Sequence, residues 1–61
     1  MIGKQLKKER NGQNLSYVNF SKLTGLSVPT LIAVEKDQNC TIETLRTYAK
    51  SLGKKLVIVL E

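Results

Sequence analysis

The sequence contains no histidine and no tryptophan, and it has one cysteine and one proline among its 61 residues. Without histidine, neither a Ser-His-Asp nor a Cys-His catalytic arrangement can be built. A zinc site needs about four Cys or His ligands, and the chain offers only Cys40. We therefore expect no enzyme activity, no catalytic residues, no metal and no cofactor.

Long hydrophobic runs are also absent. The longest continuous apolar stretch, residues 56–60, is far shorter than the ~20 residues that a membrane helix needs. No secretory signal is visible, because the first residues lead directly into a charged segment. A lone cysteine cannot form an intramolecular disulfide, which is typical of a reducing compartment. We expect a cytoplasmic protein with no membrane partner, in which Cys40 is a small loop residue.

Basic residues, in contrast, are abundant in the sequence. Ten Lys and Arg residues stand against five acidic residues, giving a net charge of +5. This balance favours a polyanionic partner, nucleic acid before an anionic membrane. The 41% hydrophobic content is sufficient for a small core. A chain of this size buries only about 60% of the surface that its unfolded form exposes, so a dimer interface would add useful stability.

Local signals predict two helices in the first half of the chain. The first is expected from Ile2 to Arg10, because Asn11-Gly12 tolerates the left-handed geometry that ends a helix. Ser16 is a candidate N-cap for the second helix, although Asn19 replaces the Glu that a complete capping box would have.

The second half predicts two more helices. Ser27 is the candidate N-cap of the third helix, and Pro29 falls within its first turn, where a missing N–H costs nothing. The polar segment 36–40 interrupts the periodicity and is predicted to be a loop. Thr41 then caps a fourth helix that Gly53 ends. Its apolar residues recur at spacings of three, four and three, at Ile42, Leu45, Ala49 and Leu52.

Residues 17–36 have the spacing of two short helices joined by a sharp turn. Gly25 can take the positive φ of that turn, and Leu26 lies beneath it. Phe20 and Leu31 can meet between the two helices. In such a helix-turn-helix the second helix is held out to enter a DNA major groove. We therefore predict a DNA-binding module.

After Gly53 the pattern changes. Residues 54–60 are Lys-Lys-Leu-Val-Ile-Val-Leu, which is typical of a β-strand. No second strand is predicted for it to pair with, and unpaired backbone groups are costly when buried. Pairing with the same strand of a second copy about a two-fold axis satisfies them. The alternative is a disordered or edge-packed tail.

With these elements in order, the chain resembles the Xre/lambda-repressor-like DNA-binding family over residues 2–53. The resemblance rests on Leu15-Ser16, Phe20-Ser21, Gly25-Leu26-Ser27, Thr30-Leu31, Val34-Glu35 and the run from Thr44-Leu45 through Ala49 to Leu52-Gly53. It implies a mainly α fold, with a four-helix DNA-binding domain over residues 1–53. The C-terminal segment 54–61 looks like the dimerisation strands of Cro and of HipB-type antitoxins. The resemblance also implies an ion pair between Arg10 and Glu35, the alternative being a phosphate contact by Arg10.

The resemblance places the base-reading residues on the exposed face of the third helix, at Val28, Pro29, Thr30, Ile32 and Ala33. This face lacks Arg, Gln and Asn, which make bidentate hydrogen bonds to guanine and adenine. It can still touch thymine methyl groups and offer the Thr30 hydroxyl. Either it reads DNA through apolar contact and DNA shape, or it faces a protein partner.

A second set of residues is expected to contact phosphates, namely Ser16, Tyr17, Ser27, Lys36 and Asn39. Helix N-termini present free N–H groups and partial positive charge to such anions. The Tyr17 hydroxyl could reach a phosphate oxygen; alternatively, its ring is partly buried against the first helix. Tyr48 is expected to be a ring at the edge of the core.

These features predict a homodimeric, sequence-specific regulator that binds a palindromic operator in double-stranded DNA. It would act as a repressor or as an antitoxin-type autoregulator. The alternative is a protein-interaction module that neutralises a toxin, with weak or no DNA binding.

Overall fold

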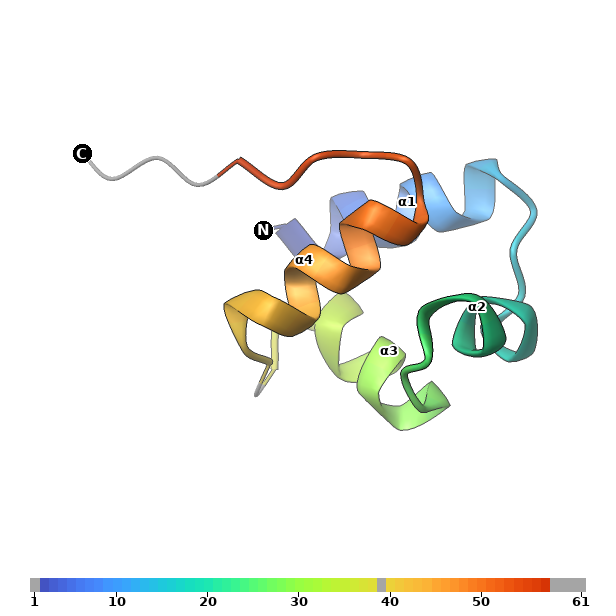
Figure 1. The fold of residues 1–61 in the computed structure, drawn as a ribbon, viewed down its shortest axis with the longest axis horizontal. Coiled ribbons are helices and arrows are strands. Elements are labelled where there is room, and N and C mark those ends of the chain that lie inside the picture. Colours follow the sequence, from blue (N-terminus) through green and yellow to red (C-terminus); the bar gives the residue numbers. More distant parts are fainter. Residues whose placement is uncertain (1, 39, 58–61) are drawn as a thin grey trace.

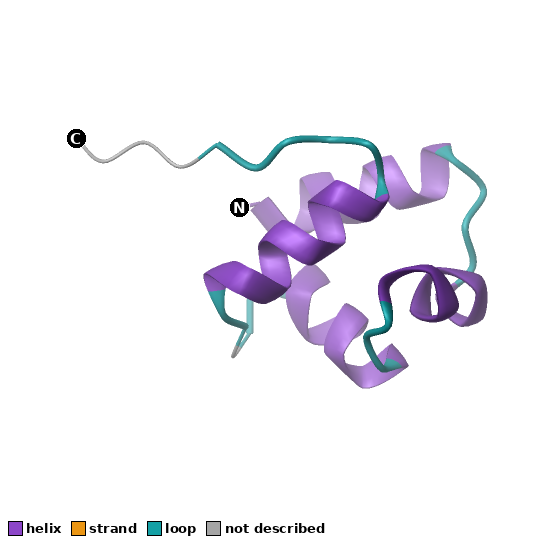
Figure 2. Cartoon of the chain, in the orientation of Figure 1, coloured by secondary structure: helices purple, strands orange, loops and turns teal. Residues whose placement is uncertain are grey.

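The computed structural model describes residues 2–38 and 40–57 (Figure 1). These residues form four α-helices: α1 (Ile2–Gly12), α2 (Tyr17–Thr24), α3 (Val28–Glu35) and α4 (Ile42–Ser51). Helix α3 packs against each of the other three helices. Figure 2 shows that the described residues outside the helices are loops and turns. The predicted mainly α, four-helix architecture is confirmed.

The predicted N-caps are confirmed for three helices. Ser16 Oγ accepts a hydrogen bond from the Asn19 N–H at 3.1 Å, and Thr41 Oγ1 accepts one from the Thr44 N–H at 3.1 Å. The side chain of Ser27 caps α3 through the Thr30 N–H. Each cap satisfies one of the N–H groups that a helix start leaves without a partner.

Helix α1 ends two residues later than predicted. It continues to Gly12, and the left-handed residue that follows it is Asn14, with φ of 57°. The Asn11-Gly12 pair forms the last turn rather than the stop, because the Gln13 N–H still bonds to the Glu9 carbonyl at 3.2 Å. Asn tolerates the left-handed region almost as Gly does, so either position could have ended the helix.

The core is one cluster drawn from all four helices. Its buried members are Leu6, Phe20, Leu31, Val34, Tyr48, Ala49 and Leu52. Phe20 and Tyr48 meet edge to face with their ring centroids 4.7 Å apart. Phe20 and Leu31 lie in this core, as predicted for the two helices of residues 17–36. Ile42, the first residue of the predicted apolar stripe of α4, is 52% exposed and lies outside the core. Periodicity identifies the inner face of α4 but not how far its neighbours extend along that face.

The turn between α2 and α3 is held by a dense set of local hydrogen bonds. Gly25 adopts φ of 77°, and its N–H bonds to the Ser21 carbonyl at 2.9 Å. The Ser21 hydroxyl donates to the Leu26 carbonyl at 2.5 Å, and Thr24 Oγ1 accepts the Leu26 N–H at 3.0 Å. The predicted role of Gly25 is confirmed.

The predicted C-terminal strand is not present where the structure describes the chain. Gly53, with φ of 74°, ends the last helical segment as predicted. Residues 54–57 are loop, and residues 58–61 lie outside the described residues. The predicted pairing of this segment across a dimer therefore stays a prediction. Over residues 2–38 and 40–57, no helix combines the length and apolar character needed to cross a membrane.

Candidate nucleic-acid interface

The outward face of α3 is the one predicted. Pro29 is exposed, and Val28, Thr30, Ile32 and Ala33 are partly exposed. On the opposite side of the helix, Leu31, Val34 and Glu35 are buried. Helix α3 lies at the lower edge of the molecule in Figure 1, so its outer face is free to meet a partner.

The start of α3 offers few polar groups. The hydroxyls of Ser27 and Thr30 lie 2.8 Å apart and form one hydrogen bond. Since one hydroxyl donates to the other, the pair retains one free O–H. Pro29 has no N–H to offer, and the Thr30 N–H is directed to Ser27 Oγ. This face therefore offers a partner apolar surface and one hydroxyl proton rather than a network of donors.

The start of α2 is better suited to bind an anion. Ser16 is exposed, and its Oγ accepts the Asn19 N–H, which leaves the hydroxyl proton of Ser16 free. The N–H groups of Tyr17 and Val18 occupy the first turn, where a helix provides no internal acceptor. Together with the positive end of the helix dipole, these groups can hold a phosphate.

The Tyr17 side chain adopts the second of its two predicted roles. Its ring is partly buried, and the central guanidinium carbon of Arg10 lies 4.1 Å from the ring centroid. The hydroxyl donates to Glu35 Oε1 at 2.7 Å. Its one proton is thus engaged inside the protein, and the group that Tyr17 offers outward at the helix start is its backbone N–H.

Glu35 is the centre of a buried polar cluster, and its predicted ion pair with Arg10 is confirmed. Arg10 Nε donates to Glu35 Oε2 at 2.8 Å, and the two side chains are only 5% and 3% exposed. The Tyr48 hydroxyl donates to the same oxygen at 2.5 Å. Arg10 also donates to the Leu15 carbonyl, which secures the segment before α2. A buried ion pair is tolerated when its remaining donors and acceptors are satisfied in this way.

The charge state of this cluster follows from its contacts. Burial by itself raises the pKa of the Glu35 carboxyl, but hydrogen bonds from the two tyrosines and the guanidinium lower the pKa below its usual value. Burial also raises the pKa of Tyr48, and the hydrogen bond to Glu35 raises it further. The hydrogen bond to Glu35 also raises the pKa of Tyr17. Glu35 is therefore ionised and the two tyrosines are protonated at neutral pH.

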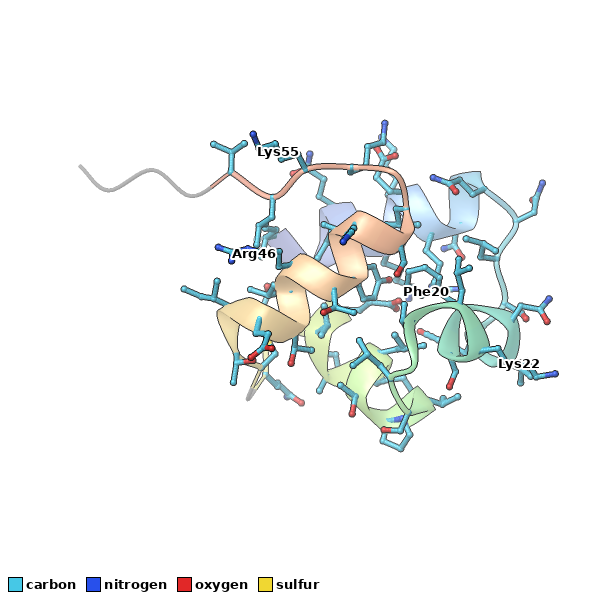
Figure 3. All side chains as sticks on the ribbon, in the orientation of Figure 1. Phe20, Lys22, Arg46 and Lys55 are labelled. Carbon is cyan, nitrogen blue, oxygen red and sulfur yellow. The ribbon has the colours of Figure 1, made fainter. Side chains whose placement is uncertain are left out.

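The helix-turn-helix holds few of the ten Lys and Arg residues of the sequence. Between residues 16 and 38 the cations are Lys22 and Lys36, both exposed. Lys36 is the C-cap of α3, and Asn39, the other predicted contact of this loop, lies outside the described residues. In Figure 3, Arg46 and Lys55 lie on the opposite side of the molecule from Lys22.

Two hydrogen bonds that hold the helices around this site together have no clear signal in the sequence. Tyr48, expected at the edge of the core, is fully buried and bonded to Glu35. Asp37, with φ of 57°, accepts the Gly3 N–H through Oδ1 at 2.9 Å and so binds the start of α1 to the end of α3. Neither contact has a periodic signal, because the partners are distant in sequence.

Comparison with known proteins identifies one family. The family model HTH_3, described as Helix-turn-helix, matches residues 6–59. The matched range contains α2, the turn at Gly25 and α3 in full. No curated protein matches the chain.

Proposed function

The chain belongs to the Xre/lambda-repressor-like helix-turn-helix family of DNA-binding regulators, and from this premise we propose that it is a sequence-specific transcriptional regulator acting as a homodimer. The observation that carries the proposal is the orientation of α3. Its apolar residues Leu31 and Val34 are completely buried, so the face bearing Val28, Pro29 and Thr30 points outward. An exposed second helix held in this way can enter the major groove of double-stranded DNA.

We assign the phosphate contacts to groups around α3. These are the Ser16 hydroxyl and the Tyr17 N–H at the start of α2, the Ser27 hydroxyl, and the Lys36 ammonium after α3. Such contacts fix the register of the protein on the duplex without reading sequence. Asn39, three positions after Lys36 in the sequence, completes the set proposed from the sequence.

Base reading is assigned to Val28, Pro29, Thr30 and Ala33. These side chains can contact thymine methyl groups, and the hydroxyl pair of Ser27 and Thr30 can supply one hydrogen bond. With so few polar groups, selection between operators depends strongly on DNA shape and deformability. The preferred sites should therefore be rich in A·T pairs.

We propose a homodimer because the sequence pattern of residues 54–60 is typical of a strand, and pairing with the same segment of a second copy would satisfy its backbone groups. Two copies related by a two-fold axis place their recognition helices about 34 Å apart, which requires a palindromic operator. The regulator would act as a repressor or an antitoxin-type autoregulator in the cytoplasm.

Selection of bound duplexes from a random pool tests this proposal. The expected result is enrichment of an inverted repeat with half-site centres about 10 base pairs, or one helical turn, apart. Binding should weaken steeply as salt rises, because counterions are released from the phosphates. A pool that shows no enriched sequence after repeated selection would contradict sequence-specific binding.

A protein-interaction module is the second candidate, and one observation favours it. The outer face of α3 is a nearly apolar patch of Val28, Pro29, Ile32 and Ala33, and such patches also serve protein contacts. A toxin-neutralising role would give a stoichiometric protein complex and no retardation of duplex DNA at low salt. The two measurements together separate this candidate from a DNA-binding regulator.

A further inference from the structure

The two helices of the helix-turn-helix are joined at both ends. At one end, the turn at Gly25 connects the last residue of α2 to the start of α3. At the other end, Tyr17, the first residue of α2, donates its hydroxyl to Glu35, the last residue of α3, at 2.7 Å. The two helices also share the core through Phe20 and Leu31. A link at their far ends adds a directional restraint on the angle between them, which apolar packing alone does not provide.

The two carboxylate oxygens of Glu35 have different partners. Oε2 accepts from Arg10 in α1 and from Tyr48 in α4, which anchors the end of α3 in the body of the domain. Oε1 accepts from Tyr17. Through this oxygen, α2 is tied to the same anchored point. The Tyr17 ring is itself covered by the Arg10 guanidinium, which limits its motion further.

We propose that Tyr17 is a positioning residue whose hydroxyl sets the orientation of α2 relative to α3, rather than a residue whose hydroxyl binds phosphate. The N–H groups at the start of α2 then lie at a fixed distance from the outer face of α3. A DNA duplex can contact the α2 N–H groups and the outer face of α3 at once only if that distance matches the spacing between a phosphate and a base edge. This inference rests on the proposed DNA-binding function.

Two matched variants test the proposal. Tyr17→Phe and Tyr48→Phe each remove one O–H donor from the same carboxylate and keep the ring in place. Only Tyr17 lies on α2, since Tyr48 belongs to α4. The comparison therefore separates a loss of helix orientation from a general effect on the Glu35 cluster.

The first measurement is affinity for one fixed duplex of random sequence at low salt, at a temperature where circular dichroism shows all proteins to be folded. Tyr17→Phe should weaken binding about tenfold, the equivalent of one charge-assisted phosphate contact. The slope of log affinity against log salt should stay close to that of the wild type, because the groups at the start of α2 are neutral and do not displace counterions as a Lys or Arg does. Tyr48→Phe should bind within about twofold of the wild type, because its hydroxyl does not orient α2.

The second measurement needs no DNA. Amide chemical shifts and hydrogen exchange of the free protein should change along α2 in Tyr17→Phe, while in Tyr48→Phe the changes should centre on α4. Changes next to residue 17 follow from the substitution itself, whereas changes that extend to the far end of α2, at residues 21–24, are expected only if the hydroxyl restrains the whole helix.

Several outcomes would overturn the inference. The first is a Tyr17→Phe protein that binds the duplex with wild-type affinity. The second is an equal loss of affinity in Tyr17→Phe and Tyr48→Phe. The third is a Tyr17→Phe protein that does not fold, since the hydroxyl would then serve stability alone. A wild-type protein that retards no duplex rejects the proposed function instead. In that event the exchange data still decide whether Tyr17 restrains α2.

Discussion

Gly3 of α1 lies directly against the carbonyl group of Val34 in α3. A Cβ atom added to Gly3 would lie 2.5 Å from the Val34 carbonyl oxygen and 2.6 Å from that of Glu35. The Gly3 N–H is bound by Asp37 Oδ1 at 2.9 Å. The absence of a side chain therefore allows α1 to approach the end of α3, the same place where Arg10 of α1 binds Glu35.

We predict that Gly3→Ala destabilises the protein although alanine is the better helix former. The added methyl group must push two backbone carbonyls away, and overpacking of this kind costs about 1–3 kcal/mol. Urea denaturation followed by circular dichroism measures the change. Gly12→Ala is the matched control in the same helix, because a Cβ there meets nothing within 4 Å. If the two variants were equally stable, the close approach of α1 to α3 would be wrong.

The helix-turn-helix itself has a conformational requirement at Gly25. Its φ of 77° is strained for residues with a Cβ, although nothing lies within 4 Å of the position. Gly25→Ala should therefore cost about 1–2 kcal/mol through backbone conformation alone. Gly25→Asn should cost less, since Asn tolerates the left-handed region. Urea midpoints of the two variants check this order, and the reverse order would exclude a conformational cause.

Stability should decline in acid because of Glu35. Its pKa in the folded protein is below the usual value of 4.5, so the unfolded chain takes up a proton more readily. The contribution is complete above the unfolded-state pKa and is lost as pH falls through the folded-state pKa. Urea midpoints measured from pH 7 downward should show this loss.

Glu35→Gln is the control for this acid dependence. It keeps the shape of the side chain but cannot titrate, so the decline below the unfolded-state pKa should be shallower than in the wild type. The variant should also be less stable at pH 7, because Arg10 would be left as a buried charge without its counter-ion. Parallel pH profiles in the two proteins would mean that other carboxyl groups govern acid unfolding.

Local chemistry explains which features the sequence predicts well. The caps at Ser16, Ser27 and Thr41 and the turn at Gly25 depend on residues within four positions of each other, so a pattern reveals them. The Arg10–Glu35 pair is expected only from the family resemblance, because 25 positions separate its members and nothing local links them. The bond from Gly3 to Asp37 is also long-range, and it has no signal at all.

The residues of the candidate site also differ in how far the sequence predicts their positions. That Val28 and Pro29 face outward is expected from the family resemblance, and it agrees with the burial of Leu31 and Val34 on the opposite side of α3. The engagement of the Tyr17 hydroxyl by Glu35 could not be deduced, because both a phosphate contact and a buried ring suit a tyrosine at a helix start. The choice depends on where the end of α3 lies relative to α2, which is a tertiary property.

Lys36 and Thr30 should affect DNA binding in different ways. Lys36 is an exposed cation after α3, so Lys36→Ala should weaken binding to all duplexes about equally. The salt slope should fall by about 0.9, the value for one phosphate contact. Arg46→Ala removes the same charge from α4, which carries none of the proposed phosphate contacts, and should have a smaller effect. Equal effects of the two variants would indicate a response to net charge rather than a contact by Lys36.

Thr30→Ala should instead reduce the preference for the selected operator over random DNA. It removes the hydroxyl of α3 itself. Because the remaining Ser27 hydroxyl is assigned to a phosphate, the outer face of α3 then keeps only apolar contacts with the bases. Removal of a base contact costs about 1–3 kcal/mol of discrimination, so the ratio of the two affinities should fall about fivefold or more. Titration of both duplexes with folded variant measures this ratio. A preference left intact would remove Thr30 from the base-reading residues and assign selection to DNA shape alone.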